Sequence, residues 1–396
     1  MRCTVFLLHS SRLRVHRRAA EFLDHHQRGI PSEQALVRRA RAIHRRVLTL
    51  DTHKDISDRL APEALPEDPR EAARWQRLYD PTVWGAQQLD FPTSRAGGLD
   101  VAFYIVYVGQ GDLDETGHAR AYEQALAKFD AIHRMARLHT DEIGLATSHD
   151  EVEAIARGGR LVACIGIENG YCMGTDLARI EEFHRLGARY MSIAHNGHSQ
   201  LGDSHTPEEP LHGGRSDLGR RVHAVQAHGR NLDDEQLRAL ASNGGVIQCV
   251  AFASYVKGNV ERDAAIAALR EAMDLPRRRG GGEPDTPEMI EKRNLFRERV
   301  RAIEARYPRA NVADFVEHID HAIAGPGLEH VAISSDCDGG GGVTGWNDAS
   351  KTFDVTLEFV RRGYDEAEIA ALWSGSTLRV WREVEAVAAR IRDSGR

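Results

Sequence analysis

The chain has 396 residues, enough for one large α/β barrel or for two ordinary domains. Hydrophobic residues make up 41% of it and charged residues 28%, a balance that excludes a disordered chain and favours a globular enzyme. The formal net charge of −7 gives no overall reason to expect nucleic acid as a partner.

The start of the chain is basic, and residues 1–46 are predicted to form an arginine-rich helical lead-in to a main domain spanning 47–396. A nucleic-acid-binding arm is the less favoured alternative. The apolar run 5–8 is too short for a signal peptide, and no later run has the length needed to span a membrane. The five cysteines are scattered and form no CxxC motif. We therefore expect a cytoplasmic protein with reduced thiols and no membrane partner.

Short apolar runs alternate with stretches of helical periodicity along the rest of the chain. Six runs are predicted to be strands, at residues 47–50, 101–107, 161–167, 190–194, 245–251 and 331–335. Helices are expected between them, for example at 119–139, 150–156, 177–186 and from about residue 233. This alternation predicts the α/β class with a TIM-type (β/α)8 barrel. Since a closed barrel needs eight strands, we expect it to be incomplete, with the largest gap between residues 195 and 245.

A charged segment at about 257–308 interrupts the alternation. Its composition favours helix, and residues 276–282 read Pro-Arg-Arg-Arg-Gly-Gly-Gly. We expect a helical insertion into the barrel with a flexible tip. A basic docking patch is the alternative, and it is less favoured because many acidic residues offset the arginines.

Four of the six runs end in an acidic residue or a histidine, namely Asp51, Glu168, His195 and Asp336. The carboxyl ends of barrel strands meet at one face, where active sites are built. These side chains are therefore expected to lie together, in a pattern typical of a metal site.

His53 and Asp55 follow the first run and are separated by one residue. In an extended segment both side chains point to the same side, so they can share a cation. Glu168 could bridge two metal ions, and the glycines beside it allow a close backbone approach. Burying this carboxylate without a partner would be costly, which favours a cation. A solvated loop is the alternative for the His-x-Asp motif considered alone.

Three further residues are candidates for contact with a substrate. His195 could stabilise an oxyanion as a neutral imidazole, and a hydrogen-bonded structural histidine is the alternative. Asp336 could orient or deprotonate a water, and Asp338 competes for that role. Arg230 could bind a substrate carboxylate through a bidentate pair, although arginines of this kind are more often on the surface.

In their combination and order, these motifs resemble the zinc-dependent membrane (renal-type) dipeptidases, peptidase family M19, a group of metal-dependent hydrolase barrels. The resemblance rests on His-x-Asp, GIENG, RYMSIAHNGHS, GRNLDDEQLRALASNGGVI and SSDCDG, and it covers nearly everything from residue 41 onward except the charged insertion. It implies a dinuclear zinc site, hydrolysis of dipeptides by a metal-activated water, and a homodimer.

The resemblance also implies a role for each candidate residue. The first metal would be held by His53, Asp55 and the bridging Glu168. His195 would lie beside the reacting carbonyl, and Asp336 would handle the proton. Arg230 would bind the C-terminal carboxylate of the dipeptide.

One departure from the family pattern changes the expected metal content. Family members carry two further zinc histidines at the ends of strands five and six, and this sequence contains neither motif. A strand–helix–strand unit, on the order of 30 to 40 residues, is missing near residues 222–223. We therefore expect one zinc ion and an open or distorted barrel with exposed strand edges. Substitute ligands from the loops are the less favoured alternative, with four candidates: His205, His212, His223 and His228.

Two other functions remain open at this point. The first is another hydrolase or isomerase reaction on the same barrel. The second is a catalytically inactive remnant that still binds metal, and the two missing histidines are the observation behind it.

Overall fold

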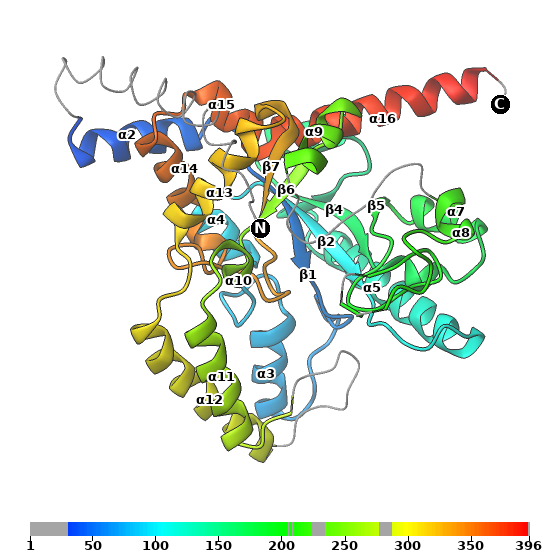
Figure 1. Cartoon of the computed structure of the whole chain (residues 1–396), viewed down its shortest axis with the longest axis horizontal. Coiled ribbons are helices and arrows are strands. Elements are labelled where there is room, and N and C mark those ends of the chain that lie inside the picture. Colours follow the sequence, from blue (N-terminus) through cyan, green and yellow to red (C-terminus); the bar gives the residue numbers. More distant parts are fainter. Residues whose placement is uncertain (1–30, 205, 208, 223–233, 277–286, 395–396) are drawn as a thin grey trace, which may run out of the picture.

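Parallel strands form the centre of the molecule (Figure 1). The computed structural model describes residues 31–204, 206–207, 209–222, 234–276 and 287–394. Within these residues there are seven strands: β1 (Leu50–Asp55), β2 (Val101–Tyr107), β3 (Ile143–Leu145), β4 (Leu161–Glu168), β5 (Ala188–Met191), β6 (Ile247–Val250) and β7 (Val331–Ser334).

Helices follow most of the strands, as in a βα barrel. The barrel helices are α4 (Phe91–Gly97), α5 (Glu115–Leu138), α6 (His149–Arg157), α7 (Ala178–Arg185), α8 (Asp217–Val222), α9 (Asp234–Ser242), α13 (Val312–Ala324), α14 (Thr352–Arg361), α15 (Glu366–Ala370) and α16 (Ser376–Asp393). The remaining helices are α2 (Glu33–His44), α3 (Pro69–Tyr79), α10 (Ala253–Val256), α11 (Val260–Ala272) and α12 (Pro287–Arg306).

All strand pairs are parallel, and β4 is central to the larger sheet. One side of β4 pairs with β2, which in turn pairs with β1. The other side pairs first with β3, along residues 161–163, and then with β5, along residues 165–167. A bridge between Lys54 and Cys337 links β1 to the segment after β7, and β7 pairs with β6.

The barrel is of the TIM type and is not closed among the described residues, because no pairing there joins β5 to β6. This confirms the expected fold class. The open side lies between β5 and β6. The missing strand–helix–strand unit, predicted near residues 222–223, would fall in this part of the chain.

Both faces of the central strands are buried, as expected for a parallel sheet covered on each side. Every residue of β2 except Tyr107 is buried. One face of β2 packs against α5, where Phe129 and Ile132 are fully buried. The opposite face packs with Leu50 and with Trp381 of α16. These contacts fix β1, β2 and β4 side by side, and the three strands carry most of the site.

Several strand boundaries differ from the prediction, most clearly those of the first strand and of β5. The first strand begins at Leu50 rather than at residue 47, because the Thr49 amide and hydroxyl bond to the Asp100 carboxylate and pairing with β2 starts one residue later. His53 and Asp55 therefore lie inside the strand. β5 ends at Met191 rather than at residue 194, where the Ser192 carbonyl oxygen accepts the Gly170 amide and the Ser192 hydroxyl accepts the Asn169 amide, both in the turn after β4.

The prediction also missed β3, which has only three residues and therefore shows no alternating pattern. The helices predicted at 119–139, 150–156 and 177–186 correspond to α5, α6 and α7 within a few residues. The charged segment forms α11 and α12, which extend away from the barrel (Figure 1).

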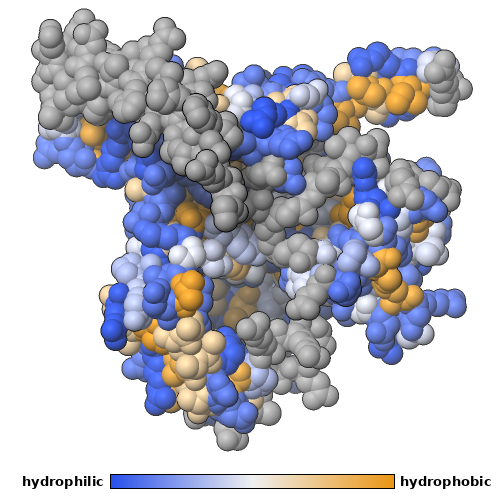
Figure 2. All heavy atoms as spheres, viewed as in Figure 1, coloured by the Kyte–Doolittle hydropathy of each residue, from blue (hydrophilic) through white to orange (hydrophobic). Residues whose placement is uncertain are grey.

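The last helix, α16, projects from the body of the molecule, and its free half carries an apolar stripe (Figures 1 and 2). Val384, Val387 and Ile391 are the exposed apolar residues of this stripe. Among the described residues, no helix is both long enough and apolar enough to cross a membrane.

Candidate metal centre

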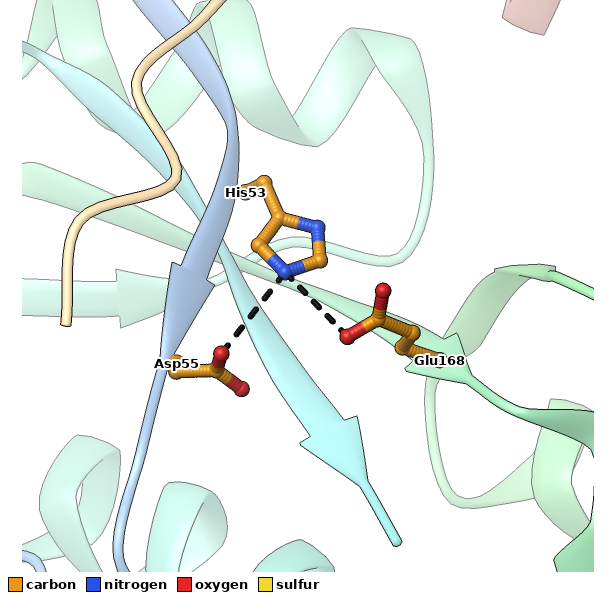
Figure 3. Close-up of side chains that lie close together, drawn as sticks. All are labelled: His53, Asp55 and Glu168. Carbon is orange, nitrogen blue, oxygen red and sulfur yellow. Dashed lines mark ion pairs between the residues drawn. The ribbon is translucent and has the colours of Figure 1, made fainter. Parts of the chain in front are cut away.

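The alternation of side chains along β1 divides its last three residues between two environments. His53 and Asp55 face the inside of the barrel, where they meet Glu168 at the end of β4 (Figure 3). Lys54 points the other way and is 1% exposed. Its ammonium donates to the Gln87 side chain at 2.9 Å and to the Leu89 carbonyl oxygen, and it pairs with Asp338 at 3.5 Å.

Three carboxylates converge on one imidazole nitrogen. His53 Nε2 lies 3.6 Å from Glu168 Oε2, 3.4 Å from Asp336 Oδ1 and 3.9 Å from Asp55 Oδ2. One ligand atom from each of His53, Asp55 and Glu168 lies within 4.8 Å of the others. The predicted metal ligands are therefore brought together from β1 and β4.

The cluster has the properties of a cation site. His53 Nε2 and Asp55 Oδ1 are buried and have no hydrogen-bond partner among the described residues. Such groups are costly to bury unless a ligand satisfies them. The separations of 3.4 to 3.9 Å are also longer than good hydrogen bonds. A divalent ion held by His53, Asp55 and Glu168 would satisfy these atoms.

The protonation states suit metal binding. Burial, followed by the nearby His195 and Lys128, lowers the pKa of His53 to about 4, so the imidazole is neutral at pH 7. Burial raises the pKa of Asp55 to about 6, so this carboxylate is still ionised at pH 7. Neutral imidazole and ionised carboxylate are the forms that coordinate metals.

Asp336 occupies a tight turn after β7. Its φ of 58° and the 63° of Asp338 are left-handed, a conformation that aspartate tolerates better than most residues. Gly339 lies so close that a Cβ atom there would be 2.4 Å from Asp55 Oδ2 and 2.6 Å from Asp336 Oδ1. The turn therefore requires a glycine to bring its backbone against the cluster.

The structure separates the two aspartates that competed for the proton-handling role. Asp336 faces His53 across 3.4 Å. Asp338 instead accepts the Gln88 amide at 2.8 Å and pairs with Lys54, so it holds the loop in place.

His195 lies on the other side of Glu168. Its Nε2 is 3.5 Å from Glu168 Oε1, and its ring packs edge-on against Tyr107 with 4.9 Å between ring centres. Although it follows β5 by four residues rather than ending the strand, it still reaches the cluster.

Arg230 lies outside the described residues, as do His205, His223 and His228. His212, the remaining candidate for a substitute ligand, is not part of the cluster, and its Nε2 lies 2.9 Å from the Ser199 carbonyl oxygen.

Asp51 supports the cluster from behind, a role that the sequence analysis did not assign. Its carboxylate is fully buried and accepts the His53 amide at 3.1 Å, the Ser335 amide at 2.9 Å and the Ser335 hydroxyl. These bonds tie the ends of β1 and β7 together, so they fix His53 relative to Asp336. No sequence motif indicates this, because the partner lies far along the chain.

A family model described as membrane dipeptidase (peptidase family M19) matches residues 37–222 and 220–395. The two matched pieces meet at the position where the sequence analysis places the missing unit. Dipeptidase aclJ of Aspergillus oryzae is 29% identical over 318 residues, covering 78% of this chain and 72% of its own length. Human Dipeptidase 3 is 25% identical over 375 residues, covering 91% of this chain and 70% of its own.

Solved structures share the fold. The probable dipeptidase PvdM from Pseudomonas aeruginosa has a TM-score of 0.72 and 24% identity, over 89% of this chain and 99% of that one. A metallo peptidase from Rhodobacter sphaeroides, liganded with a phosphinate mimic of the dipeptide L-Ala-D-Ala, has a TM-score of 0.60 and 18% identity, over 85% and 99%. At these identities the likeness shows the fold alone, whereas the family match extends over almost the whole chain. The chain therefore belongs to the membrane dipeptidase family, peptidase family M19.

Proposed function

We propose that the protein is a metal-dependent dipeptidase that uses a single zinc ion. The observation that carries this proposal is the convergence of Asp55, Glu168 and Asp336 on the unpartnered Nε2 of His53 in an M19 barrel. Zinc suits a site that combines imidazole with carboxylate oxygens.

The cluster divides into residues that would hold the ion and residues that would act on the substrate. His53, Asp55 and Glu168 would hold the zinc, which when bound lowers the pKa of a water and polarises the peptide carbonyl. Asp336 accepts the proton of the attacking water and passes it to the leaving amine. His195 donates a hydrogen bond to the oxyanion that develops at the carbonyl.

The substrate class follows from the family and from one relative. The Rhodobacter sphaeroides structure is liganded with a dipeptide mimic, which makes L-Ala-D-Ala a suitable first substrate. Arg230 would bind the C-terminal carboxylate of the dipeptide. This role is proposed from the family resemblance alone.

The test combines zinc content per chain with hydrolysis of a dipeptide panel, with and without chelator. We expect one zinc ion and turnover that the chelator abolishes. Glu168→Gln should lose both zinc and turnover, because an amide is a poor ligand. Glu142→Gln is the matched control, since Glu142 is exposed and its carboxylate pairs with Arg95 at 3.3 Å, away from the cluster. Two zinc ions per chain would refute the single-ion proposal.

A second candidate, a metal-binding protein without catalysis, is favoured by the two missing histidines. One zinc ion with no turnover on any dipeptide would establish it. If turnover is present, Arg230→Ala separates a dipeptidase from another hydrolase. In a dipeptidase it should chiefly raise KM for dipeptides and leave amides without a free carboxylate unaffected.

A further inference from the structure

A glutamine outside the predicted motifs bonds to the turn that carries Asp336. Gln88 lies just before α4, and its side-chain Oε1 accepts the Asp338 amide at 2.6 Å. Its Nε2 donates to the Gly341 carbonyl oxygen at 3.1 Å and to the Asn347 carbonyl oxygen at 2.7 Å. One side chain therefore holds the turn at two points and also bonds to the segment that follows it.

The backbone of Gln88 bonds to the same part of the chain. Its amide donates to Asp338 Oδ1 at 2.8 Å, and its carbonyl oxygen accepts the Ala349 amide at 2.8 Å. These two bonds do not depend on the side chain of Gln88. A substitution can therefore remove the side-chain bonds while the loop stays attached through its backbone.

The two points that the side chain holds lead directly to Asp336. The Gly339 and Gly341 amides both donate to the Asp336 carbonyl oxygen, at 3.2 and 2.9 Å. The backbone of Gly341 also packs against the Asp336 side chain, since a Cβ atom at Gly341 would lie 2.7 Å from Asp336 Cβ. Gly341 is thus bonded to Asp336 through its amide and to Gln88 through its carbonyl oxygen.

The conformation of the turn needs such support. Asp336 and Asp338 both have left-handed φ angles, 58° and 63°. Residues other than glycine hold this conformation only where the surrounding structure fixes it. A glutamine suits the position because its amide group is both an acceptor and a donor, and the two points on the turn require one of each.

We propose that Gln88 is a positioning residue, whose side-chain amide clamps the turn after β7 and so sets where the Asp336 carboxylate lies. The inference rests on the function proposed above, in which Asp336 handles the proton of the attacking water. It assigns a role in that reaction to a residue that touches neither the candidate metal ligands nor the substrate.

The test is Gln88→Met in the full chain, which keeps the volume of the side chain and removes its donor and its acceptor. A displacement of about 1 Å in a reacting group costs on the order of a hundredfold in rate, so kcat for L-Ala-D-Ala should fall by about that factor. KM and zinc content should stay as in the wild type, because Asp336 is not one of the three candidate ligands. An unchanged kcat would overturn the proposal, and so would a loss of zinc that accounts for the loss of kcat.

Two further variants separate positioning from a general loss of structure. Gln76→Met makes the same chemical change at an exposed residue of α3 and should leave kcat unchanged. Asp336→Asn tests the route, because two residues that act as a unit have non-additive effects. Adding Gln88→Met to Asp336→Asn should lower kcat by less than about twofold. A further hundredfold loss would mean that Gln88 acts by another route, and it would overturn the proposal.

Amide exchange of the metal-free protein supplies a readout that needs no turnover. The Gly339 and Gly341 amides donate to the Asp336 carbonyl oxygen, so their exchange measured by NMR reports the position of Asp336. Both should exchange about tenfold faster in Gln88→Met than in the wild type. Equal exchange rates would show that the turn holds itself, and they would overturn the proposal.

These measurements also separate the inference from the function on which it rests. If the wild type hydrolyses dipeptides and Gln88→Met does so equally well, only the inference about Gln88 fails. If the wild type hydrolyses no dipeptide, the proposed function itself fails, and the positioning role fails with it.

Discussion

The buried carboxylate of Asp51 can be tested by replacing it with its neutral isostere. Burial raises the pKa of Asp51 from 3.8 to about 6 against the opposing effect of its hydrogen bonds. A folded-state pKa above the unfolded value means that the carboxyl group stabilises the fold most at low pH. This contribution is fully present below about pH 4 and is lost as the pH rises through 6. The rise corresponds to about 3 kcal/mol.

Asp51→Asn should keep the geometry of the wild type. Oδ1 accepts both backbone amides, from His53 and Ser335, and an amide oxygen can do the same. Among the described residues, Oδ2 bonds to the Ser335 hydroxyl, which can accept from an amide NH2 instead of donating. The stability of the wild type relative to Asp51→Asn should therefore fall by about 3 kcal/mol between pH 4 and pH 7.

The assay is urea unfolding of both proteins across this pH range with chelator present. All other titrating groups are common to the two proteins, so the difference between their free energies of unfolding isolates Asp51. Asp51→Ala serves as the control, because it leaves the amides of His53 and Ser335 without an acceptor and should cost about 2 to 4 kcal/mol at every pH. A difference between wild type and Asp51→Asn that does not change with pH would refute the reasoning.

Three further predictions concern the centre and its support. The pKa of Asp55 is raised to about 6, so below pH 6 a cation must displace a proton from this carboxylate. The cation affinity measured by calorimetry should therefore rise about tenfold per pH unit up to pH 6 and level off above it. An affinity that does not change with pH would contradict this prediction. Lys54→Met should destabilise the fold by about 3 to 5 kcal/mol in urea unfolding, because it leaves Asp338 without its buried cation; a loss below about 1 kcal/mol would count against a structural role for the pair. Gly339→Ala should weaken zinc binding at least tenfold by displacing two carboxylates, whereas Gly258→Ala, with no atom within 4 Å of its new Cβ, should not.

The sequence was sufficient for the parts of the site that depend on local geometry. His53 and Asp55 are two residues apart, so any extended conformation brings them to the same face, and β1 does so even though its boundaries were predicted too early. Glu168 ends a long apolar run, and it is the last residue of β4. The parallel arrangement then places these groups together, which is why the fold class and the closeness of the three candidate ligands were both predictable.

The remaining features depend on contacts between distant segments. Asp51 bonds to Ser335 across 284 positions, and no local pattern encodes that partner. His195 reached the cluster for a different reason from the one predicted, because a turn rather than a strand end delivers it.

The position of the open side supports the proposal that one metal site is kept while the second site of the family is lost. The candidate ligands come from β1 and β4, and β2 joins these two strands in one continuous sheet. Asp336 follows β7, and the Lys54–Cys337 bridge connects that segment to β1. Within this half, every residue of β2 except Tyr107 is buried. The family histidines for a second ion would come from strands between β5 and β6, where the described sheet is open. Under the single-ion function proposed above, losing that unit would remove the second ion's ligands and leave the first site in place.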